Sequence, residues 1–176
     1  MARRKIPLIL GNVIEILGVA VAILLIVAAS GVNSALVRFL FYLISWACLV
    51  FFPHCLTHFV VGRLVGVRFR HYIVGKSSIT KLRLPVVSAV ATLFLLLELR
   101  VDRRSLGSLS GGARAATFAS GATASMIFPF LVPVVAFRHL PAVWSFALLL
   151  LSLANVCFDL YYSPKAGDLS RIRSVG

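Results

Sequence analysis

Two histidines four residues apart have the clearest capacity for chemistry in this chain. His54 and His58 stand at positions i and i+4 of an apolar stretch, so on a helix they occupy one face, one turn apart. This spacing lets two imidazole rings bind one metal ion. Pro53 directly precedes the pair and loosens the helix at that point. In a chain that crosses a membrane, such an interruption is tolerated where the helix lines a site. The pattern predicts a metal-binding helix face; two interfacial histidines bonded to backbone or water are the structural alternative.

A metal site needs a further ligand, and Asp159 is the first candidate. It stands about one turn from the end of the last apolar stretch, as His58 does in the second stretch, so the two groups are expected at similar depth. Asn155 lies one turn away on the same helix face and could orient a ligand or a substrate carbonyl. An acid paired with Lys165 or with an arginine is the structural alternative for Asp159. Asp168 is a second candidate, which a returning loop could deliver.

The donor set indicates which ion to expect. Two imidazoles and one carboxylate suit zinc and leave a fourth position open to water. A divalent ion would also offset the charge of a carboxylate in apolar surroundings, where an unpaired charge is costly. We therefore predict a zinc site formed by His54, His58 and Asp159.

The stretches that carry these residues are long and apolar. Apolar residues make up 60% of the 176 residues and charged residues 13%, whereas soluble domains average about 45–50% and about 25%. This composition excludes a soluble globular domain and a disordered chain. A membrane-spanning helix needs about 20 mostly apolar residues. Four stretches are long enough: residues 7–29, 36–62, 115–137 and 141–162.

A fifth apolar stretch, residues 84–99, has basic segments on both sides, and the positive-inside rule assigns its path. If it does not cross, 16 of the 18 basic residues lie on the cytoplasmic side, and Arg38 and Arg138 lie outside. If it crosses, ten lie inside and eight outside. We therefore predict four spans, both termini cytoplasmic, and a re-entrant or interfacial segment at 84–99; a fifth, short span is the alternative.

Residues 63–83 differ in composition from the spans. They contain the strand formers Val67, Phe69 and Tyr72, together with glycine and serine suited to a turn, so we expect a short cytoplasmic β-hairpin. The predicted fold is an all-α integral membrane protein, a single membrane domain over residues 1–176. It has about four transmembrane helices, the re-entrant or interfacial segment and the hairpin.

Three segments resemble the motifs of the site-2 protease family of intramembrane zinc metalloproteases. The family's H-E-x-x-H motif, with its A-R-x-x-G-V-like tail, is similar to HCLTH at residues 54–58 and GRLVGV at 62–67. Its A-G-P-x-x-N motif resembles ASGATAS at residues 119–125. Its Asn and Asp motif with prolines is similar to NVCFDLYYSPKAGD at residues 155–168. The resemblance covers about residues 37–170 and implies the family's intramembrane scaffold and its metal.

The chain departs from the family at the position that carries the chemistry. In the family, the glutamate of the first motif is the general base that activates metal-bound water. Here that position is Cys55. A thiol with an ordinary pKa of about 8.5 is a poor replacement for the glutamate. The resemblance therefore implies a catalytic position that Cys55 occupies and hydrolysis that is very slow or absent.

These observations lead to three function hypotheses. The first is a site-2-protease-like membrane protein that keeps its metal site, is proteolytically inactive or impaired, and binds transmembrane segments of other proteins. The second is an active metalloprotease with an unusual base. The third is a membrane scaffold or small transporter subunit with structural histidines. The net charge of +13 is explained by topology and by contact with anionic lipid, so membrane lipid is an expected partner and nucleic acid is not.

Overall fold

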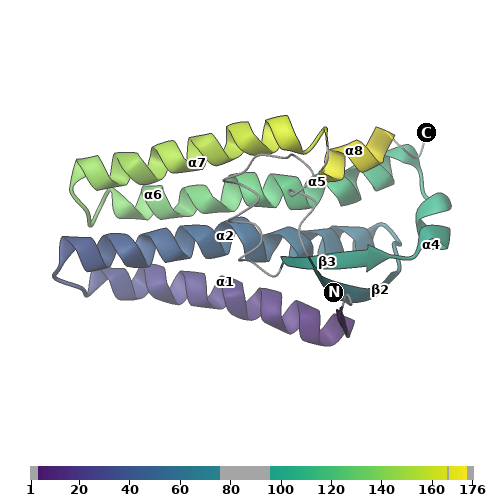
Figure 1. Ribbon diagram of the computed structural model, residues 1–176, viewed down its shortest axis with the longest axis horizontal. Helices are drawn as coiled ribbons and strands as arrows, with labels where there is room; N and C mark the ends of the chain where they lie inside the picture. The colour runs from purple at the N-terminus through teal and green to yellow at the C-terminus, as the bar shows by residue number, and fades with distance from the viewer. Residues whose placement is uncertain (1–3, 76–95, 166, 174–176) are drawn as a thin grey trace.

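The computed structural model describes residues 4–75, 96–165 and 167–173, which form a bundle of long helices with a small sheet at one end (Figure 1). The bundle consists of α1 (Leu8–Ser30), α2 (Ala35–Leu64), α5 (Gly111–Ile127), η2 (Phe128–Phe130), α6 (Leu131–Ala136) and α7 (Ala142–Tyr162). The sheet consists of β1 (Arg4–Ile6), β2 (Phe69–Gly75) and β3 (Leu96–Val101). Two short helices, α4 (Arg103–Gly107) and α8 (Asp168–Arg173), complete the described structure.

Among the described residues, four helical stretches are long and apolar enough to cross a membrane, as predicted. They are residues 8–30, 35–64, 111–136 and 142–162, close to the predicted boundaries. The third stretch is not one uniform α-helix. It passes through the 3-10 turn η2, which contains Pro129, before continuing as α6. A proline inside a helix cannot donate the usual backbone hydrogen bond, which accounts for the change in winding.

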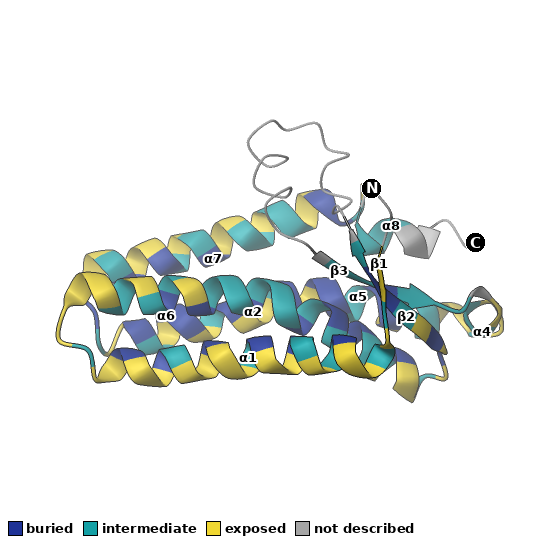
Figure 2. Ribbon diagram, turned by 60° about the horizontal axis from the view of Figure 1, so that its bottom comes forward, coloured by how far each residue is buried: buried dark blue, intermediate teal, exposed yellow. Residues whose placement is uncertain are grey.

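The outer surfaces of these helices are apolar, as a lipid-facing surface requires. Large side chains such as Ile9, Leu24 and Leu150 are exposed, and Figure 2 shows exposed residues along the outward faces of the long helices. The contacts between helices use small residues. A Cβ at Gly18 of α1 would lie 2.1 Å from the Phe52 ring of α2, so the two helices approach closely only because this residue is glycine. This distribution is compatible with an integral membrane protein.

The sheet differs from the predicted hairpin. Its strand order is β1-β2-β3, and both pairings are antiparallel. Residues 69–75 form the strand that the composition predicted, but its described neighbours are residues 4–6 and 96–101 rather than a second strand within 63–83. The predicted turn and return strand at 76–83 lie outside the described residues. Backbone pairing thus joins three segments that are distant in the sequence.

The structure also bears on the predicted re-entrant segment at 84–99. Residues 84–95 lie outside the described residues, whereas 96–99 belong to β3 and pair with β2. Gly75 pairs with Leu96, so the chain leaves and rejoins the sheet at neighbouring positions. Residues 96–99 are therefore strand: they pair with β2, and residues 97–101 alternate apolar and charged side chains.

The elements nearest the two termini lie at the same end of the bundle. Strand β1 and helix α8 both lie at the sheet end, away from the α1–α2 and α6–α7 connections (Figure 1). The side of the membrane on which this end lies stays a prediction.

Candidate metal centre

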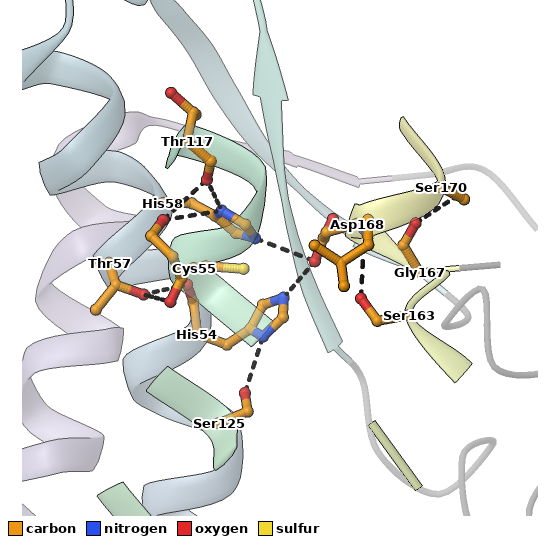
Figure 3. Close-up of polar contacts among 12 residues, drawn as sticks. His54, Cys55, Thr57, His58, Thr117, Ser125, Ser163, Gly167, Asp168 and Ser170 are labelled. Atoms are coloured by element: carbon orange, nitrogen blue, oxygen red, sulfur yellow. Dashed lines mark hydrogen bonds and ion pairs between the residues drawn. The ribbon is translucent and has the colours of Figure 1, made fainter. Parts of the chain in front are cut away.

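Helix α2 presents both predicted histidines to one carboxylate (Figure 3). Nε2 of His54 lies 2.9 Å from Oδ2 of Asp168, and Nε2 of His58 lies 3.1 Å from the same oxygen. The two rings are nearly perpendicular, with centroids 4.8 Å apart. One ligand atom from each of the three residues lies within 4.8 Å of the others. The i, i+4 spacing therefore places the rings on one face, and Asp168 closes the group.

The other ring nitrogen of His58 is held by a backbone carbonyl. Its Nδ1 lies 2.6 Å from the Thr117 carbonyl oxygen on α5. A carbonyl oxygen only accepts, so Nδ1 carries the hydrogen and donates it. In a neutral imidazole this leaves a lone pair on Nε2, the atom that faces Asp168.

His54 is held in the same tautomer by a side chain of α5. Its Nδ1 lies 2.9 Å from Oγ of Ser125, and that hydroxyl donates its hydrogen to the Val50 carbonyl at 2.9 Å. Since the hydroxyl hydrogen is already used, Ser125 accepts a hydrogen bond from Nδ1 of His54. The neutral ring therefore also directs an Nε2 lone pair toward Asp168.

When both rings are neutral, three acceptors therefore face one point. Two Nε2 lone pairs and a carboxylate oxygen repel one another at these distances unless positive charge lies among them. A divalent cation supplies that charge, as do two additional imidazole protons. Histidine ligands of metals commonly donate the other ring N–H to a carbonyl or similar acceptor, which is the pattern of both rings here.

The spacing of these atoms is close enough for a metal ion to bind among them. Ligands about 2.0–2.2 Å from a tetrahedral zinc ion lie about 3.4 Å from one another. The two distances of 2.9 and 3.1 Å between ring nitrogens and the carboxylate oxygen are close to this value. The group could therefore hold a metal ion.

A glycine on α5 makes room for the second ring. A Cβ at Gly121 would lie 2.2 Å from Nε2 of His58, closer than any real contact. His58 is correspondingly buried, and its side chain is 11% exposed, whereas that of His54 is 33% exposed. The more exposed His54 therefore marks the open side of the group.

The turn between α7 and α8 delivers Asp168. Ser163 ends α7 and is buried; its Oγ accepts a hydrogen bond from the Leu169 amide, and its carbonyl accepts one from the Ser170 amide. Burial alone would raise the pKa of the Asp168 carboxyl. When both Nε2 atoms also carry hydrogen, the hydrogen bonds and positive charge of His54 and His58 outweigh burial and hold that pKa well below its usual range. Asp168 is therefore an anion at neutral pH, as a metal ligand must be.

The two aspartates that the sequence offered have different positions. Asp168, the second candidate, joins the histidines, whereas Asp159 is not a member of the three-residue group among the described residues. Asp159 stays on α7, near enough to interact electrostatically with His54 and Asp168. The reason is the turn after α7, which reverses the chain so that Asp168, and not Asp159, faces α2.

Asn155 does not face the group but contacts the helix that positions His54. Its Nδ2 donates a 2.9 Å hydrogen bond to the backbone carbonyl of Ser125, the residue whose hydroxyl holds His54. This contact ties α7 to α5 at the level of the histidines. The predicted role of Asn155 in binding substrate stays a prediction.

Cys55 is directed toward the sheet. Its Sγ donates to the Leu97 carbonyl of β3 at 3.1 Å, and the residue is buried among Val67, Phe69 and Tyr72. The thiol is not one of the three ligands of the group. The side chain at the predicted catalytic position therefore links α2 to an edge strand.

The two residues that set the tautomers were not assigned from the sequence. Ser125 lies in the segment 119–125 that resembles a family motif, so its position was indicated but its role was not. Thr117 contributes a backbone carbonyl, and any residue type would supply that atom. Only the packing of α5 on α2 identifies it.

Comparison of the chain with protein-family models, with curated proteins and with solved structures finds no match.

Proposed function

We propose that this chain is an integral membrane protein that binds zinc through His54, His58 and Asp168 and holds a segment of another membrane protein without cleaving it. The observation that carries the proposal is the convergence of two Nε2 atoms on one carboxylate oxygen, with both Nδ1 atoms bonded to acceptors on the other side of the rings. A divalent cation resolves this arrangement, and the donor set favours zinc.

The chain's own residues argue against efficient hydrolysis. A bound zinc ion would polarise a carbonyl or a water molecule at the open position. A general base must lie within hydrogen-bond reach of that water to take its proton. Position 55, where the resembling family has glutamate, holds a thiol whose hydrogen bond goes to Leu97. Asp168 is engaged by both histidines. The group therefore suits binding and polarisation better than proton abstraction.

The sheet supports the proposed partner. Among the described strands, in the order β1-β2-β3, strand β3 is an edge, and it lies beside α2, as the contact between Cys55 and Leu97 shows. An exposed strand edge binds an extended segment by backbone hydrogen bonds. A transmembrane segment that unwinds near the sheet end of the bundle could pair with this edge next to the metal group.

The direct test is metal content. The full chain is purified in detergent and its zinc, iron and manganese are measured by mass spectrometry after dialysis against each metal. We expect about one zinc per chain, with loss of zinc in His54→Ala and His58→Ala. His139→Ala is the matched control, because this histidine lies in the α6–α7 connection. A wild-type protein that retains no metal would refute the proposal and favour structural histidines.

Partner binding needs its own test. Photo-crosslinking residues placed at 98 and 100 of β3 should capture membrane proteins, whereas the same group at Leu150, on the lipid-facing surface of α7, should capture mainly lipid. Cleavage of the captured proteins by the wild-type chain would contradict the proposal that this chain does not cleave its partner. It would support a protease with an unusual base.

A further inference from the structure

A carboxyl buried between α1 and α2 lies outside the candidate metal group. Glu15 belongs to the stripe of α1 that is buried, and the residue is 2% exposed. One turn along this stripe, Gly18 packs against the Phe52 ring of α2. Because α1 and α2 run antiparallel (Figure 1), Glu15 lies at the level of Cys55, with which it interacts electrostatically. The carboxyl is therefore enclosed by protein.

Among the described residues, nothing neutralises this carboxyl. Its Oε2 is buried and has no hydrogen-bond partner. The ion pairs among the described residues do not include Glu15. The nearest basic residues along the chain are Lys5 and Arg38, ten and 23 residues away. An ionised carboxylate without a partner is costly in such surroundings, so the site calls for a bound positive charge.

Tyr72 of β2 brings a hydrogen-bond donor to this region. Its ring packs against Gly11, and its hydroxyl donates a 2.7 Å hydrogen bond to Oδ1 of Asn12. Asn12 and Glu15 are three residues apart and therefore lie on one face of α1. Burial, and after it the nearby Cys55 and Glu15, raise the pKa of Tyr72. The hydroxyl thus remains a donor throughout the neutral range.

The other titratable groups of this region have partners of their own. The Cys55 thiol of α2 donates to the Leu97 carbonyl. Glu98 of β3, which interacts electrostatically with that thiol, pairs with Arg100. A change in the charge of Glu15 therefore acts first on the Tyr72 hydroxyl.

That hydroxyl has two acceptors of different strength within its region. When the O–H bond of the Glu15 carboxyl breaks, the proton passes to water and the electron pair stays on the carboxylate. A hydrogen bond to a carboxylate is stronger than one to a neutral amide oxygen, so the hydroxyl moves from Asn12 to Glu15. Tyr72 pairs with Leu99 of β3, so this movement is transmitted to the sheet.

We propose that Glu15 is a proton-binding site that switches the contact between α1 and the sheet. With the proton bound, Tyr72 bonds to Asn12; with the proton released, Tyr72 bonds to the Glu15 carboxylate. Ionisable residues inside membrane helices commonly belong to proton-binding sites. The inference goes beyond the proposed metal site and does not depend on it, because Glu15 is not a member of the metal group.

Infrared spectroscopy tests the proposal on the full chain in lipid nanodiscs, titrated between pH 6 and pH 10. The chain contains only two glutamates, Glu15 and Glu98, so glutamate labelled with ¹³C in its side-chain carboxyl identifies their bands. We expect a labelled C=O band of a protonated carboxyl at pH 7, which alkaline pH removes. Glu15→Gln, which preserves the size of the side chain, should lack the band. Glu98→Gln is the matched control and should retain it, because Glu98 is 39% exposed and pairs with Arg100.

Two further variants test the switch itself. Tyr72→Phe removes the donor that stabilises the carboxylate, so the pH at which half the band is lost should rise by about one to two units. Asn12→Ala removes the competing acceptor, so that pH should fall. A purely structural role of the two side chains predicts no such opposite shifts.

Three results would overturn the proposal. The first is the absence of a labelled protonated band from the wild-type chain at pH 7, which needs no variant to observe. The second is a band that persists to pH 10, because the proton would then not exchange. The third is an equal midpoint in the wild-type chain, Tyr72→Phe and Asn12→Ala, which would exclude the hydroxyl from the switch. Zinc binding is measured separately, so none of these results decides the metal site.

Discussion

Substitution of Gly121 by alanine should remove zinc binding without unfolding the helix that carries it. The new Cβ would lie 2.2 Å from Nε2 of His58, the atom that we propose binds the ion. An optimal contact needs about 3.5 Å, so the ring must move by more than about 1 Å. Metal–ligand distances tolerate only about 0.2 Å. The Nδ1 hydrogen bond to Thr117 limits how the ring can turn, so we expect His58 to be lost as a ligand.

The expected effect is a loss of at least about 100-fold in zinc affinity, which corresponds to about 2.7 kcal/mol. Competition with a chromophoric chelator measures it. Gly112→Ala on the same helix is the matched control, because a Cβ there has no atom within 4 Å. It should bind zinc within about twofold of the wild-type chain. Since alanine favours a helix over glycine by about 1 kcal/mol, neither variant should lose helical structure. Wild-type affinity in Gly121→Ala would show that Nε2 of His58 does not bind the ion.

Three further predictions follow from the same geometry. Ser125→Ala removes the acceptor that holds the tautomer of His54, so zinc affinity should fall by about 10–100-fold in the chelator competition; an unchanged affinity would mean that the hydroxyl does not orient the ring. Acidification from pH 7.5 to 5.5 should weaken zinc binding at least about tenfold, because zinc needs neutral imidazole, which titrates near 6.5 in model peptides. The low pKa of Asp168 keeps this ligand ionised over the whole range, so its stabilising contribution would be lost only below about pH 4. A zinc affinity that does not change between pH 7.5 and 5.5 would therefore contradict histidine ligation. Cys55→Glu places a carboxylate where the resembling family has its base, so a transmembrane reporter in proteoliposomes should be cut by this variant and not by Cys55→Gln; equal cleavage by both would remove position 55 from the chemistry.

Local features of the sequence were sufficient for the long helices and for the histidine pair. Each span is a continuous apolar run whose length matches a bilayer, and length and hydropathy do not depend on distant residues. The relation of His54 to His58 is equally local, since helical geometry alone puts positions i and i+4 on one face. The resemblance to site-2 proteases rests on such local motifs, and it stays a prediction.

For the strand at residues 69–75, local sequence predicts the strand itself but not its partners. Its composition identified it as a strand, because aromatic and β-branched residues favour extended backbone. Composition does not select the partner strand, and any nearby segment with turn residues satisfies the pattern. The described partners are residues 4–6 and 96–101. Backbone hydrogen bonds are nearly independent of side-chain identity, so only the packed chain selects which edges meet.

The third member of the candidate metal group was decided by tertiary structure for a similar reason. Asp159 and Asp168 offer the same chemical group, and the depth of a helical residue favoured the first. The turn after α7 reverses the chain and brings Asp168 to the histidines. The tautomers of both rings depend on atoms of α5 that are far away in the sequence. The sequence by itself therefore determined the long apolar helices and the paired imidazoles, while the direction of the Nε2 atoms and the carboxylate that faces them required the packing of α5 and α8 near α2.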